Sequence, residues 1–264
     1  MTSQSAANLN DLFDNAVDSG MVSKETSSLL SGNLGPVVVA GAAGLAMEDI
    51  VASDVTLITI LIDASSSIAY SNLEQAIRDG QNMLLDAFAS SNESQAILVS
   101  LWTFNSAQRV VHSYVPVDQA RRLDTRNYNG AGYTVLYDAW CDALAANVAY
   151  AQQLRDGGTP CRSVVVVITD GEDTGSQRSR RDCRRISQDL LASEQFVLAF
   201  VGVGDATNFR DVAKGMGVPD GCVAVQKDAN PTTLRKVFQM VSQSAIRASQ
   251  GRIRPGAQAG FFQP

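Results

Sequence analysis

A long apolar run that ends in an acidic residue constrains this chain most. Residues 55–62 read Val-Thr-Leu-Ile-Thr-Ile-Leu-Ile, and Asp63, Ser65 and Ser67 follow directly. A β-branched apolar run of this length predicts a buried strand. In open α/β folds the carboxyl ends of such strands hold the ligand sites. Carboxylate and hydroxyl oxygens suit a hard divalent cation such as Mg²⁺, so a metal site is predicted here.

The rest of the chain alternates between strand-like and helix-like segments. Further strands are predicted at 96–104, 108–115, 163–169, 196–203 and 222–226, the second of them as a hairpin partner of the first. Helices are predicted at 72–89, 134–154, 178–194, 207–215 and 231–248. This alternation implies an α/β fold with a doubly wound, mainly parallel six-stranded sheet flanked by helices on both faces.

Three regions are predicted along the chain. Residues 52–249 form the α/β domain. Residues 1–51 form a short, partly helical N-terminal extension, which either packs against the sheet domain or serves as a docking element for a partner. Residues 250–264 are rich in Gly, Pro and Gln and are predicted to be a flexible tail. In that tail, Phe261 and Phe262 are either a small anchor or exposed by chance.

Composition limits the classes of partner. The chain has 264 residues, of which 45% are apolar, enough for a substantial core. Its net charge of −6 disfavours nucleic acid and anionic membranes as partners. The N-terminus lacks the features of a signal peptide, and no apolar run is long and unbroken enough for a membrane span, so a cytoplasmic protein is expected. Reduced, mostly buried thiols are expected at Cys141, Cys161, Cys183 and Cys222, which form no CxxC pair.

Two further segments extend the predicted metal site. The loop Gly130–Thr134 precedes a helix, and the Thr134 hydroxyl is suited either to cap that helix or to bind a metal. Asp170 ends the apolar strand at 163–169 and is followed by Gly171. If the two strands are neighbours, Asp170 lies at the same sheet edge as Asp63. The three serines at 65–67 have a simpler interpretation as a helix-capping turn.

Taken together, these segments resemble the metal-ion-dependent adhesion site of von Willebrand factor A domains over roughly residues 52–249. The resemblance rests on Asp63-x-Ser65-x-Ser67, on Thr134 in a glycine-rich loop, and on Asp170 in Thr-Asp-Gly, in that order. It implies that these five residues bind Mg²⁺, with Mn²⁺ or Ca²⁺ as alternatives, directly or through water. It also implies that solvent or an acidic side chain of a protein partner fills the remaining position.

Two classes of function follow. The first is a non-catalytic, metal-dependent protein–protein interaction module, and the second is a metal-dependent hydrolase acting on a phosphoester. Hydrolysis needs a general base, for which Asp138, Glu172 and Asp173 are the nearby unassigned acids. The interaction module is favoured, with no enzymatic activity expected. The chain also resembles bacterial, intracellular stand-alone vWA proteins of stress-response systems, including tellurium-resistance-associated forms, which implies a scaffold in a regulatory complex.

Two other features remain open. The segment 178–185 holds five arginines, which are either a solvated helix face or an attraction for an acidic or phosphorylated partner. His112, the single histidine, lies on a predicted peripheral strand and is assigned a structural or exposed role. Oligomeric state and partner identity do not follow from the residues.

Overall fold

A six-stranded sheet organises the molecule. The computed structural model describes residues 3–32, 34–256 and 260–262. Within them the strands lie in the order β3-β2-β1-β4-β5-β6. Their bounds are β1 (Val55–Asp63), β2 (Ile97–Phe104), β3 (Gln108–Pro116), β4 (Cys161–Thr169), β5 (Phe196–Val203) and β6 (Val223–Gln226). Only the β2–β3 pair is antiparallel among these, as predicted for a hairpin.

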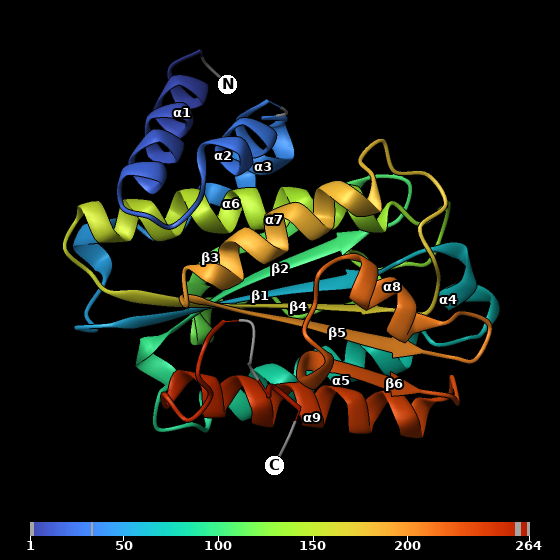
Figure 1. Cartoon of the computed structure of the whole chain (residues 1–264). Helices are drawn as coiled ribbons and strands as arrows, with labels where there is room; N and C mark the ends of the chain where they lie inside the picture. The colour runs from blue at the N-terminus through green and yellow to red at the C-terminus, as the bar shows by residue number, and fades with distance from the viewer. Residues whose placement is uncertain (1–2, 33, 257–259, 263–264) are drawn as a thin grey trace.

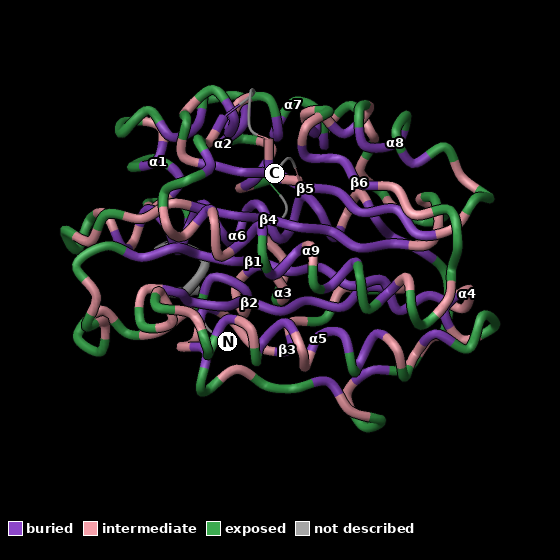
Figure 2. Tube along the Cα trace, turned by 90° about the horizontal axis from the view of Figure 1, so that it is seen from below, coloured by how far each residue is buried: buried purple, intermediate pink, exposed green. Residues whose placement is uncertain are grey.

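The register of the central strands brings the predicted metal residues to one edge. Ile62 pairs with Thr103 on one side and with Ile168 on the other, so β1, β2 and β4 end together. Every residue of β1 is buried, because the sheet is covered on both faces. Figure 2 shows the central strands as buried along most of their length. A fully covered parallel strand reads as a continuous apolar run, which is why these strands were predictable.

Helices cover both faces of the sheet (Figure 1). On one face lie α6 (Leu136–Asp156), α7 (Arg180–Ala192) and α8 (Phe209–Gly215). On the other, α5 (Glu74–Ala89) packs against α9 (Pro231–Ser249). This arrangement confirms the predicted doubly wound α/β fold. Short 3₁₀ turns occur at Met47–Asp49, Ser94–Ala96, Val117–Gln119 and Asp220–Cys222.

The N-terminal extension packs on the domain. It contains α1 (Ser3–Asp18), α2 (Lys24–Ser31) and α3 (Pro36–Ala42), and α1 and α3 lie against α6. Phe13, Leu30 and Val38 have no exposed surface and belong to the same apolar core as the sheet. This second layer explains why α6 is buried on nearly every side rather than along one stripe. Of the two interpretations of the extension, the structure supports packing.

The described part of the C-terminal segment is not a free tail. Phe261 is fully buried, and its carbonyl oxygen accepts a 3.1 Å hydrogen bond from Arg247 Nη2. Gly256 N–H donates to the carbonyl of Phe196, and Phe262 N–H donates to that of Gly221. The prediction of a flexible tail is therefore wrong for these residues, because the aromatic ring has a place in the core. Residues 257–259, 263 and 264 of the predicted tail lie outside the described part.

Local differences from the predicted elements are small. A five-residue helix, α4 (Ser66–Tyr70), was not predicted, since five residues carry too little periodicity. The four cysteines are unbridged, and three of them are buried, as expected of reduced thiols. No single helix in the described residues is long and apolar enough to cross a membrane; one bent pair, Lys24–Ser31 with Pro36–Asp49, reaches that length and composition jointly.

Candidate metal centre

Asp63 sits at the carboxyl end of β1 with 1% of its surface exposed. Its Oδ1 accepts a 2.8 Å hydrogen bond from the backbone N–H of Ser65, and its Oδ2 accepts a 2.6 Å hydrogen bond from Thr169 Oγ1. These two bonds hold the carboxylate in one orientation while leaving further lone pairs on both oxygens. Asp63 is thus a positioned acceptor at the sheet edge.

A chain of side-chain hydrogen bonds connects the β1 loop to the β4 loop. Ser65 Oγ lies 3.0 Å from Ser67 Oγ, and Ser67 Oγ donates a 2.7 Å hydrogen bond to Asp170 Oδ1. Ser65 is the N-cap residue of α4, yet its side chain makes no capping hydrogen bond. The hydroxyls therefore face the carboxylates rather than the helix end, which argues against the simple capping-turn interpretation.

Thr134 lies against the loop after β4, which carries Asp170. Its Oγ1 is 3.7 Å from the position that a Cβ on Gly171 would take, next to Asp170. The residue is 6% exposed, and its hydroxyl makes no hydrogen bond to any residue the structure describes. Helix α6 begins at Leu136, two residues later than predicted, so Thr134 is outside the capping position. Its hydroxyl is left available as a ligand.

The glycine loop before Thr134 packs closely on the β1 loop. Ala131 N–H donates to the Ala64 carbonyl at 2.8 Å, and Ser66 N–H donates to the Gly132 carbonyl at 3.1 Å. A Cβ on Gly130 would approach the backbone of Ser65 to 2.9 Å. Gly132 has a φ of +77°, a conformation that glycine adopts without steric cost. These contacts fix the loop beside the serines.

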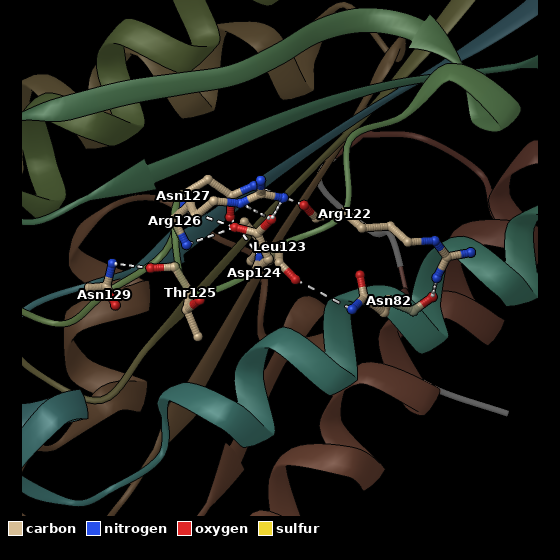
Figure 3. Close-up of polar contacts among 8 residues, drawn as sticks. All are labelled: Asn82, Arg122, Leu123, Asp124, Thr125, Arg126, Asn127 and Asn129. Carbon is tan, nitrogen blue, oxygen red and sulfur yellow. Dashed lines mark hydrogen bonds and ion pairs between the residues drawn. The ribbon is translucent and has the colours of Figure 1, made fainter.

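The segment that leads into the glycine loop is held by its own polar contacts (Figure 3). Asp124 accepts hydrogen bonds from the backbone N–H groups of Arg126 and Asn127, and Asn127 Nδ2 donates to the Arg122 carbonyl. Arg122 in turn reaches α5 by donating to the Asn82 carbonyl at 3.1 Å. This anchored turn places the residues that follow, beginning with Tyr128.

Tyr128 and Thr169 hold Asp63 in place, and neither was predicted from the sequence. The Tyr128 hydroxyl donates a 2.5 Å hydrogen bond to the Asp63 carbonyl oxygen, and its ring is buried. Thr169 holds the Asp63 carboxylate from the neighbouring strand. Tyr128 contacts the backbone of Asp63, and Thr169 contacts its Oδ2. Neither residue belongs to a sequence motif with a fixed distance from Asp63. The Thr that precedes Asp170 in Thr-Asp-Gly was the available signal.

Burial dominates the electrostatics of the two carboxylates. It raises the pKa of Asp63 to about 6, against the hydrogen bonds from Thr169 and Ser65, and the charge of Asp170 adds to this. Burial also raises the pKa of Asp170, with the Ser67 hydrogen bond opposing it. Two partly desolvated carboxyl groups at one edge disfavour their ionised forms unless a positive charge lies between them.

The donor set fits a hard divalent cation. The described residues contain no cluster of three or more His, Cys, Asp or Glu that would hold a metal. Two carboxylates and three hydroxyls, Thr134 among them unpaired, instead offer an all-oxygen set of the kind that Mg²⁺ or Ca²⁺ prefers. The structure thus brings Asp63, Ser65, Ser67 and Asp170 into one hydrogen-bonded chain and places Thr134 beside it.

The three other acids near the site have different roles. Asp173 Oδ1 accepts from the Tyr137 N–H at 3.1 Å, at the start of α6. The Asp138 carboxylate accepts from the N–H groups of Gln177 and Arg178 at 2.9 and 2.8 Å. Both carboxylates therefore tie the β4–α7 loop to the α6 N-terminus. Glu172 is exposed.

His112 lies on the edge strand β3, as predicted, away from the carboxyl edge of the central strands. Its Nδ1 accepts a 3.2 Å hydrogen bond from the backbone N–H of Arg121. Burial lowers the pKa of His112 to about 4, and the charge of Arg121 acts in the same direction. A neutral, packed imidazole is consistent with the structural role assigned to it.

Comparisons with solved structures identify the same fold. The zinc-occupied MIDAS form of proximal thread matrix protein 1 from the mussel byssus matches with a TM-score of 0.51 and 18% identity, over 73% of this chain and 46% of that chain. The PilB minor pilin of Streptococcus sanguinis matches with a TM-score of 0.55 and 11% identity, over 75% and 63%. The pilus adhesin SpaC of Lactobacillus rhamnosus GG, in an open conformation, matches with a TM-score of 0.53 and 12% identity, over 74% and 30%.

The chain thus spans less than two thirds of the length of each of these proteins. A comparison with curated protein sequences finds no match. The family model of the von Willebrand factor type A domain matches residues 58–252, about three quarters of the chain. Members of this family are known as metal-dependent adhesion and protein-interaction modules. Together with the sheet order and the site geometry, this match shows that the chain belongs to the von Willebrand factor type A domain family.

Proposed function

We propose that this protein is a metal-dependent protein–protein interaction module. Asp63, Ser65, Ser67, Thr134 and Asp170 hold a divalent cation, for which Mg²⁺ is the first candidate and Mn²⁺ or Ca²⁺ the alternatives. When bound, the cation supplies an open coordination position that takes an acidic side chain of a partner. The observation that carries this proposal is the hydrogen-bonded chain from Asp63 to Asp170, which gathers two carboxylates at the carboxyl edge of the sheet.

The surface beside the site favours a protein partner. Exposed large hydrophobic side chains in the described structure are Tyr70, Tyr133 and Val51, with 84%, 71% and 92% of their surface accessible. Tyr70 ends α4, three residues after Ser67, and Tyr133 immediately precedes Thr134. Tyrosines are enriched among the residues that dominate binding at protein interfaces. Two such side chains therefore flank the metal residues on their two loops.

The alternative, a metal-dependent phosphoester hydrolase, has less support. Two of its three candidate bases, Asp138 and Asp173, are engaged with backbone N–H groups at the start of α6 and in the following loop. These hydrogen bonds hold both carboxylates in structural positions between α6 and the following loop, where they do not act on a metal-bound water. Glu172 remains as the single exposed candidate. Binding of a partner carboxylate needs no base at all.

The setting of this module is a further proposal. The resemblance to stand-alone vWA proteins of bacterial stress-response systems supports a scaffold in a cytoplasmic regulatory complex, of the tellurium-resistance-associated kind. Co-purification from a bacterial host under tellurite stress, compared with unstressed cells, tests this placement. Recovery of the same partners in both conditions contradicts a stress-specific role.

Partner capture with and without chelator tests the module itself. Immobilised protein is presented with native lysate in Mg²⁺, in EDTA, and as the Asp170→Ala variant in Mg²⁺. Partners are expected in the first sample and absent from the other two. Asp118→Ala, which removes an exposed carboxylate that makes no ion pair with a described residue, is the matched control and should retain the partners. Equal recovery in all samples contradicts metal-bridged binding.

A further inference from the structure

A groove between α2 and α7 lies apart from the metal centre and is rich in arginine. It is shallow and open to solvent, with a volume of about 630 Å³. Figure 1 shows α2 beside α7 on the outer side of the helical layer, and the two helices are in contact. Among the residues that line this α2–α7 groove are Thr26, Arg181, Arg184, Arg185, Gln188 and Ala192. Three arginines of the five-arginine segment noted in the sequence therefore border this open groove.

The tertiary structure divides the five arginines into two groups. Arg178 forms a largely buried ion pair with Asp142, and Arg180 pairs with Asp211. Arg185 pairs with Glu25 across the groove. These three charges are therefore already compensated within the molecule.

Arg181 and Arg184 differ from the other three. Both are exposed, and neither side chain makes a hydrogen bond or an ion pair with a described residue. They are three residues apart on α7, so their side chains start from neighbouring positions on one helix face. Asp182, between them in sequence, is engaged by the N–H and the hydroxyl of Ser179. Two guanidinium groups are thus available on one face.

Two acids also line the groove, and each already has a partner, although the partner of Asp189 is neutral. Glu25 is held by Arg185, and Asp189 Oδ2 accepts a 2.6 Å hydrogen bond from the N–H of Ser23. The lining has three arginines and two acids, so it carries a net positive charge of one, and Arg181 and Arg184 are the arginines without an ion pair. Two arginine forks on successive turns match the oxygens of one phosphate group, which arginine binds in a bidentate manner.

Thr26 provides an independent indication of a ligand. It lines the groove and has no exposed surface, yet its Oγ1 has no hydrogen-bond partner. A buried hydroxyl without a partner is unfavourable, and native structures usually satisfy such groups. To reach a ligand in the groove the side chain must change its χ1 rotamer, and this change breaks no existing hydrogen bond.

The length of the groove indicates an extended segment. Arg181 and Ala192, which both line it, are 11 residues apart on α7. This separation corresponds to roughly 16 Å at the helical rise of about 1.5 Å per residue. An extended peptide advances about 3.3 Å per residue, so the groove accommodates about five residues.

The negative net charge of the chain disfavours a polyanion such as RNA.

We propose that the α2–α7 groove binds a phosphorylated segment of a partner protein. Arg181 and Arg184 hold the phosphate, and Thr26 Oγ1 donates a hydrogen bond to the segment. Phosphorylation of the partner then switches binding on, because a phosphate carries nearly two negative charges at neutral pH. This proposal does not rest on the metal site.

A peptide-capture experiment in EDTA tests the proposal independently of any metal. The probe is a degenerate pentapeptide library with phosphoserine at the centre, compared with a library that has serine there. The phosphoserine library is expected to be retained at least about tenfold better. The Arg181→Gln/Arg184→Gln double variant should lose about tenfold of that retention. Equal retention of the two libraries by the unaltered protein overturns the proposal.

A matched variant controls for net charge. Arg210→Gln/Arg235→Gln also removes two exposed arginines, on α8 and α9, and should retain the phosphoserine library. Equal losses in the two double variants mean that general charge is responsible and overturn the site. Thermal melting of all variants confirms that each is folded.

Two further arms locate the ligand and its class. Thr26→Val keeps the side-chain shape without the hydroxyl and should weaken retention severalfold. Unchanged retention by this variant overturns placement in the groove. A five-nucleotide RNA is the last probe. If it binds more tightly than the phosphopeptides and loses binding in the Arg181/Arg184 variant, the phosphoprotein assignment is overturned in favour of nucleic acid.

Discussion

Ser67 Oγ donates a 2.7 Å hydrogen bond to Asp170 Oδ1, across 103 residues of sequence. This bond connects the loop after β1 to the loop after β4. It exists because the two strands are neighbours in register, with Leu61 opposite Val167. The two halves of the site are therefore held together by the sheet before any cation binds, and removing either member should affect metal affinity more than folding.

Ser67→Ala should weaken binding of Mg²⁺ or Mn²⁺ by at least about tenfold, because one oxygen ligand and the bond that orients Asp170 are both lost. The free energy of unfolding in EDTA should fall by only about 1 kcal/mol, the usual net value of one hydrogen bond. Isothermal titration with Mn²⁺ and urea denaturation measure the two effects. Ser71→Ala, after the end of α4, is the control. A loss of stability without a loss of affinity contradicts the ligand role.

The pKa of Asp63 predicts opposite pH dependences for the free and the metal-bound protein. Its folded value of about 6 lies above the ordinary aspartate pKa of 3.8. Between these values the folded state retains a proton that the unfolded state has lost, so the free energy of unfolding in EDTA should decrease as pH rises from about 4 to about 6.

Metal binding needs the ionised carboxylate, so affinity should fall as pH drops below about 6. The rise in melting temperature on adding Mg²⁺ should be larger at pH 7.5 than at pH 5. Asp63→Asn should abolish the rise at both values and remove this group's contribution to the pH slope in EDTA. A Mg²⁺-induced rise that is the same at pH 5 and pH 7.5 contradicts the assignment.

Tyr70→Ala and Tyr133→Ala should weaken partner binding without weakening metal binding. Each ring is exposed beside a ligand loop, and truncation of a tyrosine at the centre of an interface commonly costs about 2 kcal/mol of binding free energy. Surface plasmon resonance with a captured partner measures the loss, and Mn²⁺ titration checks the site. Val51→Ala, exposed in the segment before β1, is the control. Unaltered partner affinity in both tyrosine variants places the interface elsewhere.

Gly41→Ala should destabilise the protein by about 1–3 kcal/mol, the range for overpacking a core. A Cβ at Gly41 in α3 would lie 2.1 Å from the ring of Trp102 in β2. Gly35→Ala is the control, since nothing lies within 4 Å of its added Cβ. Urea denaturation of the two variants measures the difference. Equal midpoints contradict the finding that the N-terminal extension shares the core of the sheet.

Much of the fold followed from local pattern. β1, β4 and β5 are buried on both faces, so each is a continuous apolar run that periodicity detects. The five candidate ligands were predictable for a related reason. Each lies at or after a strand end or in a glycine loop, where a polar residue next to an apolar run indicates a site. Apolar periodicity did not predict the short helix α4 or the first residue of α6.

Other features depend on contacts between distant residues. Thr169 and Tyr128 orient Asp63 from a neighbouring strand and a separate loop. Phe261 finds a buried place near the start of β6, which its Gly- and Pro-rich surroundings did not predict. The five arginines also look alike in sequence, and three of them are distinguished only by acids on other elements.

The amino-acid sequence by itself determined the class of fold, the order of the strands along the chain and the candidate residues that offer oxygen ligands. It did so because buried strands and polar strand ends are visible in short stretches of sequence. Tertiary structure decided the rest. It set which hydroxyls face a carboxylate instead of a helix end, as at Ser65, and it raised the pKa of Asp63 by burial. It also left Arg181 and Arg184 available by pairing their neighbours. The physical reason is that hydrogen bonds, desolvation and ion pairs depend on distances between atoms that the fold alone brings together.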